Sequence, residues 1–137
     1  MSKETRLCLL HSVTALGLGL LLYVFLRQNT YLHTLLEAVF RLDIPIPQYS
    51  AAHLQFVANW LGDFLWAYAL CFALYRLLSP FPRRLLLAAL AVIVLGAVLE
   101  CLQKLKILSG TFDPLDIFTE SVAAGLAAII IKRSLSL

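Results

Sequence analysis

Three carboxylates lie within or at the start of apolar stretches of this sequence, where charged side chains are uncommon. They are Asp63, Glu100 and Glu120, and the last leads directly into the run SVAAGLAAIII. Because a charged side chain in hydrocarbon is costly, an acid in such a run normally faces the interior of a helix bundle or a wet cavity. Carboxylates in that setting can carry protons or hold a hard divalent cation. These three acids are therefore the first candidates for chemistry.

Each of the three acids has a second polar residue about one helical turn away. Asn59 stands four residues before Asp63, and Asp116 stands four before Glu120. Gln103 follows the remaining acid by three, so each pair shares one face of a helix. A divalent metal such as Mg²⁺ or Ca²⁺ would use carboxylate oxygens, and the predicted ligands are Glu100, Asp116 and Glu120. With Asp113 included, the candidate polar site comprises Asn59, Asp63, Glu100, Gln103, Asp113, Asp116 and Glu120.

The composition indicates what elements must position these residues. Of 137 residues, 61% are hydrophobic and 14% are charged, which is typical of a membrane protein. A helix that crosses a bilayer needs roughly 17 to 25 such residues. The first apolar run is longer than the core of a signal peptide and no small-x-small cleavage site follows, which favours a retained helix. The sequence predicts an all-α, four-transmembrane-helix bundle in one membrane domain, 1–137, with spans near 7–26, 54–78, 85–105 and 114–131.

The long connection between the first two predicted spans contains a further helical pattern. Apolar residues recur every three or four positions in YLHTLLEAVFRL, whereas His33, Glu37 and Arg41 share the opposite face. This pattern predicts a short interfacial amphipathic helix near 30–42, which the prolines of DIPIP end. The alternative is a packed re-entrant loop.

The distribution of basic residues predicts the orientation of the chain. Lys and Arg favour the cytoplasmic side of short loops. If both termini are cytoplasmic, seven of the eleven Lys and Arg residues lie on that side. The segment 79–84, SPFPRR, would be a tight cytoplasmic turn, because two prolines stop one helix and two arginines begin the next. The seven residues are Lys3, Arg6, Arg76, Arg83, Arg84, Lys132 and Arg133.

This orientation brings the three intramembrane acids to one depth. At about 1.5 Å per residue, Asp63 lies roughly two turns from the outer end of its span and Glu120 about 9 Å below the outer end of the last one. Glu100 lies about 22 Å from the cytoplasmic end of a hydrocarbon core about 30 Å thick. The prediction is one acidic site in the outer third of the bilayer.

Structural roles account for some of these residues equally well. Asp113 precedes Pro114 and matches a helix N-cap with proline at the first helical position, and Asp116 then favours the positive end of the helix dipole. For these two acids capping alone could suffice. For the three intramembrane acids, the alternative is structural pairing or hydrogen bonding of protonated carboxyls. Lys104 follows Glu100 by four residues, but its stem would point toward the outer surface, and Arg27 at the outer end of the first span is another possible partner.

Three segments together resemble a known family. GDFLWAYAL at 62–70, LECLQ at 99–103 and GTFDPLDI at 110–117 resemble the VanZ-like family of small bacterial membrane proteins, whose named member is linked with teicoplanin resistance. The resemblance implies a multi-pass protein of the bacterial cytoplasmic membrane with a connection to the cell envelope and to antibiotic resistance. It also implies that the family's acidic positions fall on Asp63, Glu100, Gln103, Asp113 and Asp116.

Three classes of function fit these patterns. The first is a site open to the outer leaflet for a cell-envelope lipid or lipid-linked head group, with a divalent metal where phosphate would otherwise repel the acids. Such a metal could also support hydrolysis of a phosphodiester or pyrophosphate bond, although no hydrolase signature is present, so the question of catalysis stays open. The second is a small proton- or ion-coupled permease, which would have to form a homo-oligomer. The third is a noncatalytic membrane scaffold or accessory protein. Membrane lipids are the expected partners, and no nucleic-acid motif is present.

Overall fold

The chain forms four long helices. The computed structural model describes residues 1–26, 38, 39, 41, 52–108 and 111–135, and for 25, 26 and 52–59 it describes the backbone alone. The helices are α1 (Lys3–Leu26), α3 (Ala52–Leu77), α4 (Arg84–Lys104) and α5 (Pro114–Leu135). No strand occurs among the described residues, so the all-helical prediction is confirmed.

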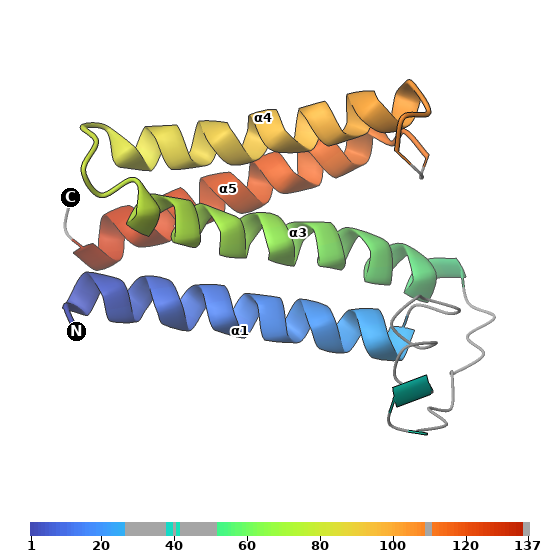
Figure 1. The fold of residues 1–137 in the computed structure, drawn as a ribbon, viewed down its shortest axis with the longest axis horizontal. Helices are drawn as coiled ribbons and strands as arrows, with labels where there is room; N and C mark the ends of the chain where they lie inside the picture. The colour runs from blue at the N-terminus through green and yellow to red at the C-terminus, as the bar shows by residue number, and fades with distance from the viewer. Residues whose placement is uncertain (27–37, 40, 42–51, 109–110, 136–137) are drawn as a thin grey trace.

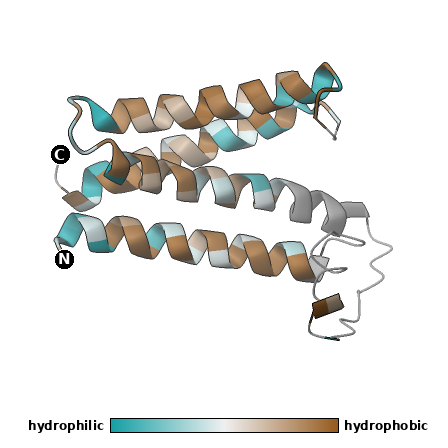
Figure 2. Cartoon of the chain, viewed as in Figure 1, coloured by the Kyte–Doolittle hydropathy of each residue, from teal (hydrophilic) through white to brown (hydrophobic). Residues whose placement is uncertain are grey.

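Three of these helices are long and apolar enough to cross a membrane. They are α4, α5 and the segment Lys3–Val24 of α1. Figure 2 shows hydrophobic residues along most of their length and hydrophilic residues toward their ends. The predicted span 54–78 corresponds to α3, and its membrane crossing stays a prediction. The predicted interfacial helix at 30–42 lies outside the described residues, apart from residues 38, 39 and 41.

The helices run alternately up and down, so that both termini lie at the same end (Figure 1). Helix α3 is central because it packs against α1, α4 and α5, while α4 also packs against α5. Consequently, the start of α3, the end of α4 and the start of α5 meet at the end opposite the termini. The predicted acidic residues belong to these three segments.

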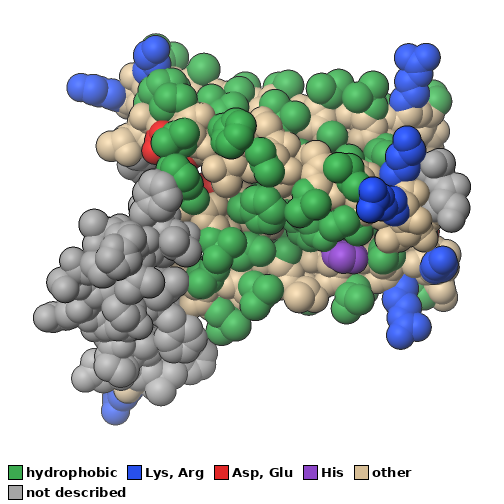
Figure 3. All heavy atoms as spheres, turned by 180° about the vertical axis from the view of Figure 1, so that it is seen from behind, with side chains coloured by type: hydrophobic (Ala, Val, Ile, Leu, Met, Phe, Trp, Pro, Cys, Tyr) green, Lys and Arg blue, Asp and Glu red, His purple; other side chains and the backbone are tan. Residues whose placement is uncertain are grey.

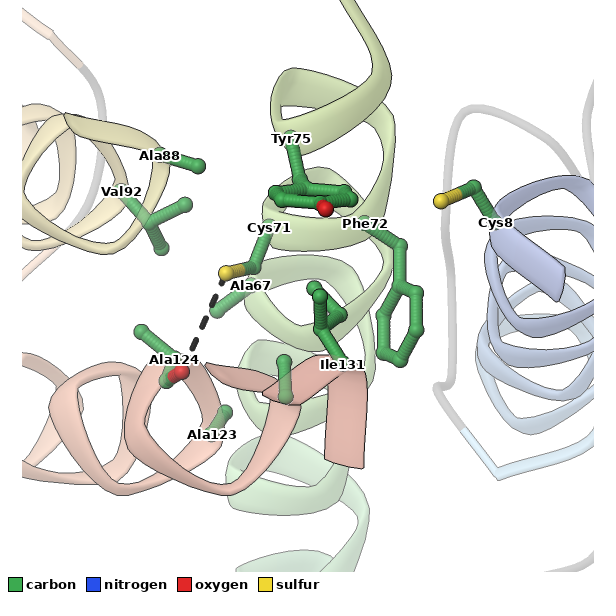
Figure 4. Packing of buried hydrophobic residues seen from close by; sticks show 11 residues of the cluster. Cys8, Ala67, Cys71, Phe72, Tyr75, Ala88, Val92, Ala123, Ala124 and Ile131 are labelled. Carbon is green, nitrogen blue, oxygen red and sulfur yellow. Dashed lines mark hydrogen bonds between the residues drawn. The ribbon is translucent and has the colours of Figure 1, made fainter. Parts of the chain in front are cut away.

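Small side chains let the central helices approach closely. Helix α5 buries Ala123, Ala124 and Ala127, and α4 presents a buried stripe with a four-residue repeat that includes Val92 and Gly96. Figure 4 shows these helices around the buried residues of α3, with the Cys71 thiol 3.8 Å from the carbonyl oxygen of Ala124. Small residues at the contact are typical of helices that associate by van der Waals packing in a membrane.

Local sequence signals explain where the helices begin and end. The Asp113 carboxylate accepts a hydrogen bond of 2.9 Å from the amide of Leu115, which is the predicted N-cap of α5. Helix α3 ends at Leu77, before the prolines of the turn, and α4 begins at Arg84. The last helix continues to Leu135, beyond the predicted end at 131, so it carries Lys132 and Arg133 in its final turn.

Candidate functional site

The Glu120 carboxylate is buried in the interface between α4 and α5. The residue is 5% exposed, and its carboxylate lies against Gly96 of α4. A Cβ atom at position 96 would overlap the Oε2 atom of Glu120, so the glycine provides the room that this acid occupies. The carboxylate thus fills a recess in the neighbouring helix.

The surroundings of Glu120 bring like charges together. The charges of Asp63, Asp116 and Glu100 act repulsively on its carboxyl when they are ionised, and the Trp66 side chain is a neighbour that interacts with it favourably. The Oε2 atom is buried and has no hydrogen-bond partner among the described residues. A buried acceptor without a partner is costly, and its repulsion from other carboxyls adds to that cost when they are ionised. The arrangement therefore favours a proton, a cation or a hydrogen-bond donor at this place.

Glu100 has a different environment although it is equally buried, with 5% exposure. Its Oε2 atom accepts a hydrogen bond of 2.8 Å from the amide of Asp113, just before α5 begins. That amide is one of the donors left unsatisfied at a helix start. Glu100 therefore connects the end of α4 to the start of α5, which is a structural role that the spacing of the sequence did not indicate.

The other predicted site residues lie around these two acids. Asp63, Gln103, Asp113 and Asp116 are partly buried at the same end of the bundle. Asp113 acts as the helix cap, and no side-chain hydrogen bond joins Gln103 to another described residue of the site. The side chain of Asn59 lies outside the described residues.

The three acids predicted as metal ligands have different neighbours in the structure. Within the described residues, no three His, Cys, Asp or Glu side chains form a group that could hold a metal ion. The physical reason is that Glu100 directs one oxygen to the amide of Asp113, while Glu120 lies in the recess at Gly96. Lys104, which follows Glu100 by four residues, is exposed, and its Nζ lies 5.0 Å from the centre of the Phe112 ring.

Two contributors to the site were not predicted from the sequence, Gly96 and the Trp66 contact with the acid. Gly96 could have been found from a four-residue repeat in the sequence, which places the glycine on the same buried face as an acid. The repeat consists of Ala88, Val92, Gly96 and Glu100. The indole contact has no comparable local signal, because it joins α3 to α5.

The opposite end of the molecule is basic. Figure 3 shows more Lys and Arg side chains at the end that holds both termini than at the other end, where the visible acidic side chains lie beside further Lys or Arg side chains. At the basic end Arg84 donates two hydrogen bonds to the Glu4 carboxylate, at 2.6 and 3.1 Å. Its guanidinium also lies over the Tyr75 ring, 4.4 Å from the centroid.

A separate polar pair lies between α1 and α3. The hydroxyl of Tyr68 is 2.8 Å from the Nδ1 atom of His11, and the imidazole stacks on Phe72 with a centroid distance of 4.5 Å. These contacts give the histidine a packing role between two helices. An open groove of about 450 Å³ beside it has a mainly apolar lining.

Comparisons of the chain with protein-family models, with curated proteins and with solved structures found no match.

Proposed function

We propose that the chain is a VanZ-like protein of the bacterial cytoplasmic membrane that binds a cell-envelope lipid or lipid-linked head group at its acidic end. In this proposal all four helices cross the membrane and both termini face the cytoplasm, in agreement with the distribution of Lys and Arg. The acidic end then lies toward the outer leaflet.

The observation that carries this proposal is the buried Oε2 atom of Glu120, which lacks a partner among the described residues. An ionised carboxylate only accepts hydrogen bonds, so it recognises groups that donate them. The ligand part that fits is an ammonium or hydroxyl group of the head group rather than its phosphate. This preference follows from the electrostatic interactions of Glu120 with Asp63, Glu100 and Asp116.

The test compares two head groups that differ in hydrogen-bond donors. The purified protein is placed in phosphatidylcholine nanodiscs with phosphatidylethanolamine or with a polyprenyl-linked amino sugar, and retained lipid is counted by native mass spectrometry. Glu120→Gln is expected to lower retention of the amine-bearing lipid about tenfold, because a hydrogen bond to a charged group contributes about 1.5–3 kcal/mol. Equal retention of amine and choline head groups by the wild-type protein would contradict the proposal.

Glu4→Gln is the matched control for this experiment. It also removes one carboxylate from a helix of the same bundle, but at the opposite end, where its partner is Arg84. Retention of the amine-bearing lipid should therefore match that of the wild-type protein. Addition of Mg²⁺ or Ca²⁺ tests the metal-dependent form of the proposal, which predicts that retention rises with the cation.

A scaffold or accessory role is the second candidate, and the hydrogen bond from the Asp113 amide to Glu100 favours it. In that case the acids hold α4 and α5 together, and replacement of either Glu100 or Glu120 lowers stability without affecting the binding of a ligand. Proton- or ion-coupled transport is the further alternative, and flux through proteoliposomes that depends on Glu120 would support it over lipid binding.

A further inference from the structure

A groove of about 570 Å³ lies at the basic end, between the end of α3, the turn that follows it, the start of α4 and the last turn of α5. Its lining combines cationic side chains with apolar ones, among them Arg83, Arg84, Lys132, Phe81 and Leu86. It is far along the bundle from the acidic site, because the acids lie where α4 ends and α5 begins (Figure 1).

The cations of this groove are only partly neutralised. Arg84 pairs with Glu4, whereas Arg83 and Lys132 are exposed and form no ion pair with a described residue. The groove consequently carries two positive charges that no described carboxylate matches. This charge is complementary to an anion.

The start of α4 adds amide donors to these charges. The N-cap residue Arg83 has a left-handed backbone, with φ 60° and ψ 25°, and no side chain caps the helix. The first amides of a helix have no intrahelical acceptor, and the dipole makes this end attractive to anions.

A buried hydroxyl in the lining supplies an independent indication of a ligand. Tyr75 is fully buried, and its hydroxyl has no hydrogen-bond partner among the described residues. Figure 4 shows this side chain on α3 within the packed core, and the same residue lines the groove. A phosphate oxygen in the groove would accept the hydrogen bond that the hydroxyl otherwise lacks.

We propose that this groove binds the phosphate of an anionic phospholipid. Phe81 and Leu86 are 55% and 54% exposed beside the cations, at the start of a helix that is apolar and long enough to cross a membrane. Acyl chains can therefore lie along α4 while the phosphate contacts Arg83, Lys132 and the Tyr75 hydroxyl. A soluble phosphate ester would leave this apolar lining unused.

The experiment measures retention of phosphatidylglycerol against phosphatidylcholine by native mass spectrometry of the full chain from mixed nanodiscs. Arg83→Asn and Lys132→Gln should each lower the preference for phosphatidylglycerol about fivefold, as expected for one cation near an anionic lipid. Asparagine is chosen because it tolerates the left-handed backbone. Arg133→Gln is the control, since this exposed residue neighbours Lys132 but does not line the groove.

Tyr75→Phe separates lipid binding from a purely structural role. It keeps the ring beneath Arg84 and removes the hydroxyl, so thermal stability in detergent should not fall, while the preference for phosphatidylglycerol should decrease. Soluble glycerol phosphate should fail to displace the lipid. The proposal is overturned if the wild-type protein shows no preference for phosphatidylglycerol, if both cation variants keep the full preference, or if glycerol phosphate displaces the lipid.

Discussion

The two ends of this helix bundle use charge in opposite ways. At the basic end, Arg84 of α4 meets Glu4 of α1 through two hydrogen bonds, and the Tyr75 ring lies beneath the guanidinium. At the acidic end, the Glu120 carboxyl interacts with other acids, and its Oε2 atom has no partner among the described residues. The basic end therefore uses an ion pair to connect two helices. At the acidic end, the burial of Glu120 beside other acids is not explained by a gain in stability.

This difference makes the acidic end, at Glu120, the stronger candidate for a functional site. A paired charge at a helix end is sufficiently explained by the contact that it makes. A buried carboxyl beside like charges lowers stability, and such groups within apolar helices are functional candidates. Glu100 shows that position alone is not decisive, because it is equally buried but satisfied by an amide. Replacement should therefore raise stability at Glu120, lower it at Glu100, and lower it by less at the ion pair.

Replacement of Glu120 should have the largest effect, and it should be stabilising. Glu120→Met removes the Oε2 acceptor that has no partner among the described residues and its repulsion from other carboxyls, and it keeps a similar volume. These gains should exceed the loss of the Trp66 contact, so the free energy of unfolding should rise by about 1–3 kcal/mol. The measurement is reversible unfolding in mixed micelles. A fall in stability would mean that the carboxylate holds the helices together, and the contrast between the two ends would disappear.

Replacement of Glu100 should act in the other direction. Glu100→Met leaves the Asp113 amide without its acceptor and should lower the free energy of unfolding by about 1–2 kcal/mol. Glu100→Gln keeps an acceptor oxygen in the same place and serves as the matched control with a smaller loss. If both variants were as stable as the wild-type protein, the hydrogen bond would contribute nothing to the bundle.

The ion pair at the basic end should contribute a smaller coupling. A double-mutant cycle with Arg84→Met and Glu4→Gln is expected to give about 1 kcal/mol, since the two side chains are 24% and 26% exposed. The coupling should decrease as salt is added, because the pair is partly accessible to solvent. Measured coupling energies near zero at low salt would show that this end is not connected through charge.

Replacement of Gly96 should have the smallest effect on stability, and this effect should depend most clearly on whether the Glu120 side chain is present. In a helix interior, alanine is favoured over glycine by about 1 kcal/mol. Gly96→Ala should therefore stabilise a Glu120→Ala protein by about 0.5–1 kcal/mol. In the wild-type background the new Cβ must displace the Glu120 carboxylate, so the gain should be reduced or reversed. Equal effects in both backgrounds would show that the acid does not use the recess.

Much of the helical architecture could be predicted because its signals are local. Apolar length indicated four helices, the prolines of the 79–84 turn marked the end of α3, and Asp113 with Pro114 marked the start of α5. The observed bounds of the helices differ from the predicted spans by at most four residues. The two largest differences are at the start of α1, predicted at residue 7, and at the end of α5, predicted at residue 131. At both places the helix continues through polar residues that a search for apolar spans excludes.

Only part of the candidate site could be predicted from the sequence. Helical spacing and alternating direction placed Asp63, Glu100 and Glu120 toward one end, and in the structure Glu120 experiences the charges of the other two. The metal trio stays a prediction, and spacing along a helix did not indicate that Glu100 turns toward the Asp113 amide, just before α5 begins. Whether any of these acids binds a ligand stays a prediction.

The sequence by itself determined the helical segments, their alternating direction and the end of the bundle at which most of the acids lie, because apolar length, caps and turn residues act within a few positions of the chain. Only the tertiary structure decided which charges are satisfied. The rotation and separation of neighbouring helices bring Gly96 to Glu120, the Asp113 amide to Glu100 and Glu4 to Arg84. Those contacts depend on side-chain packing between helices, which spacing along a single helix does not specify.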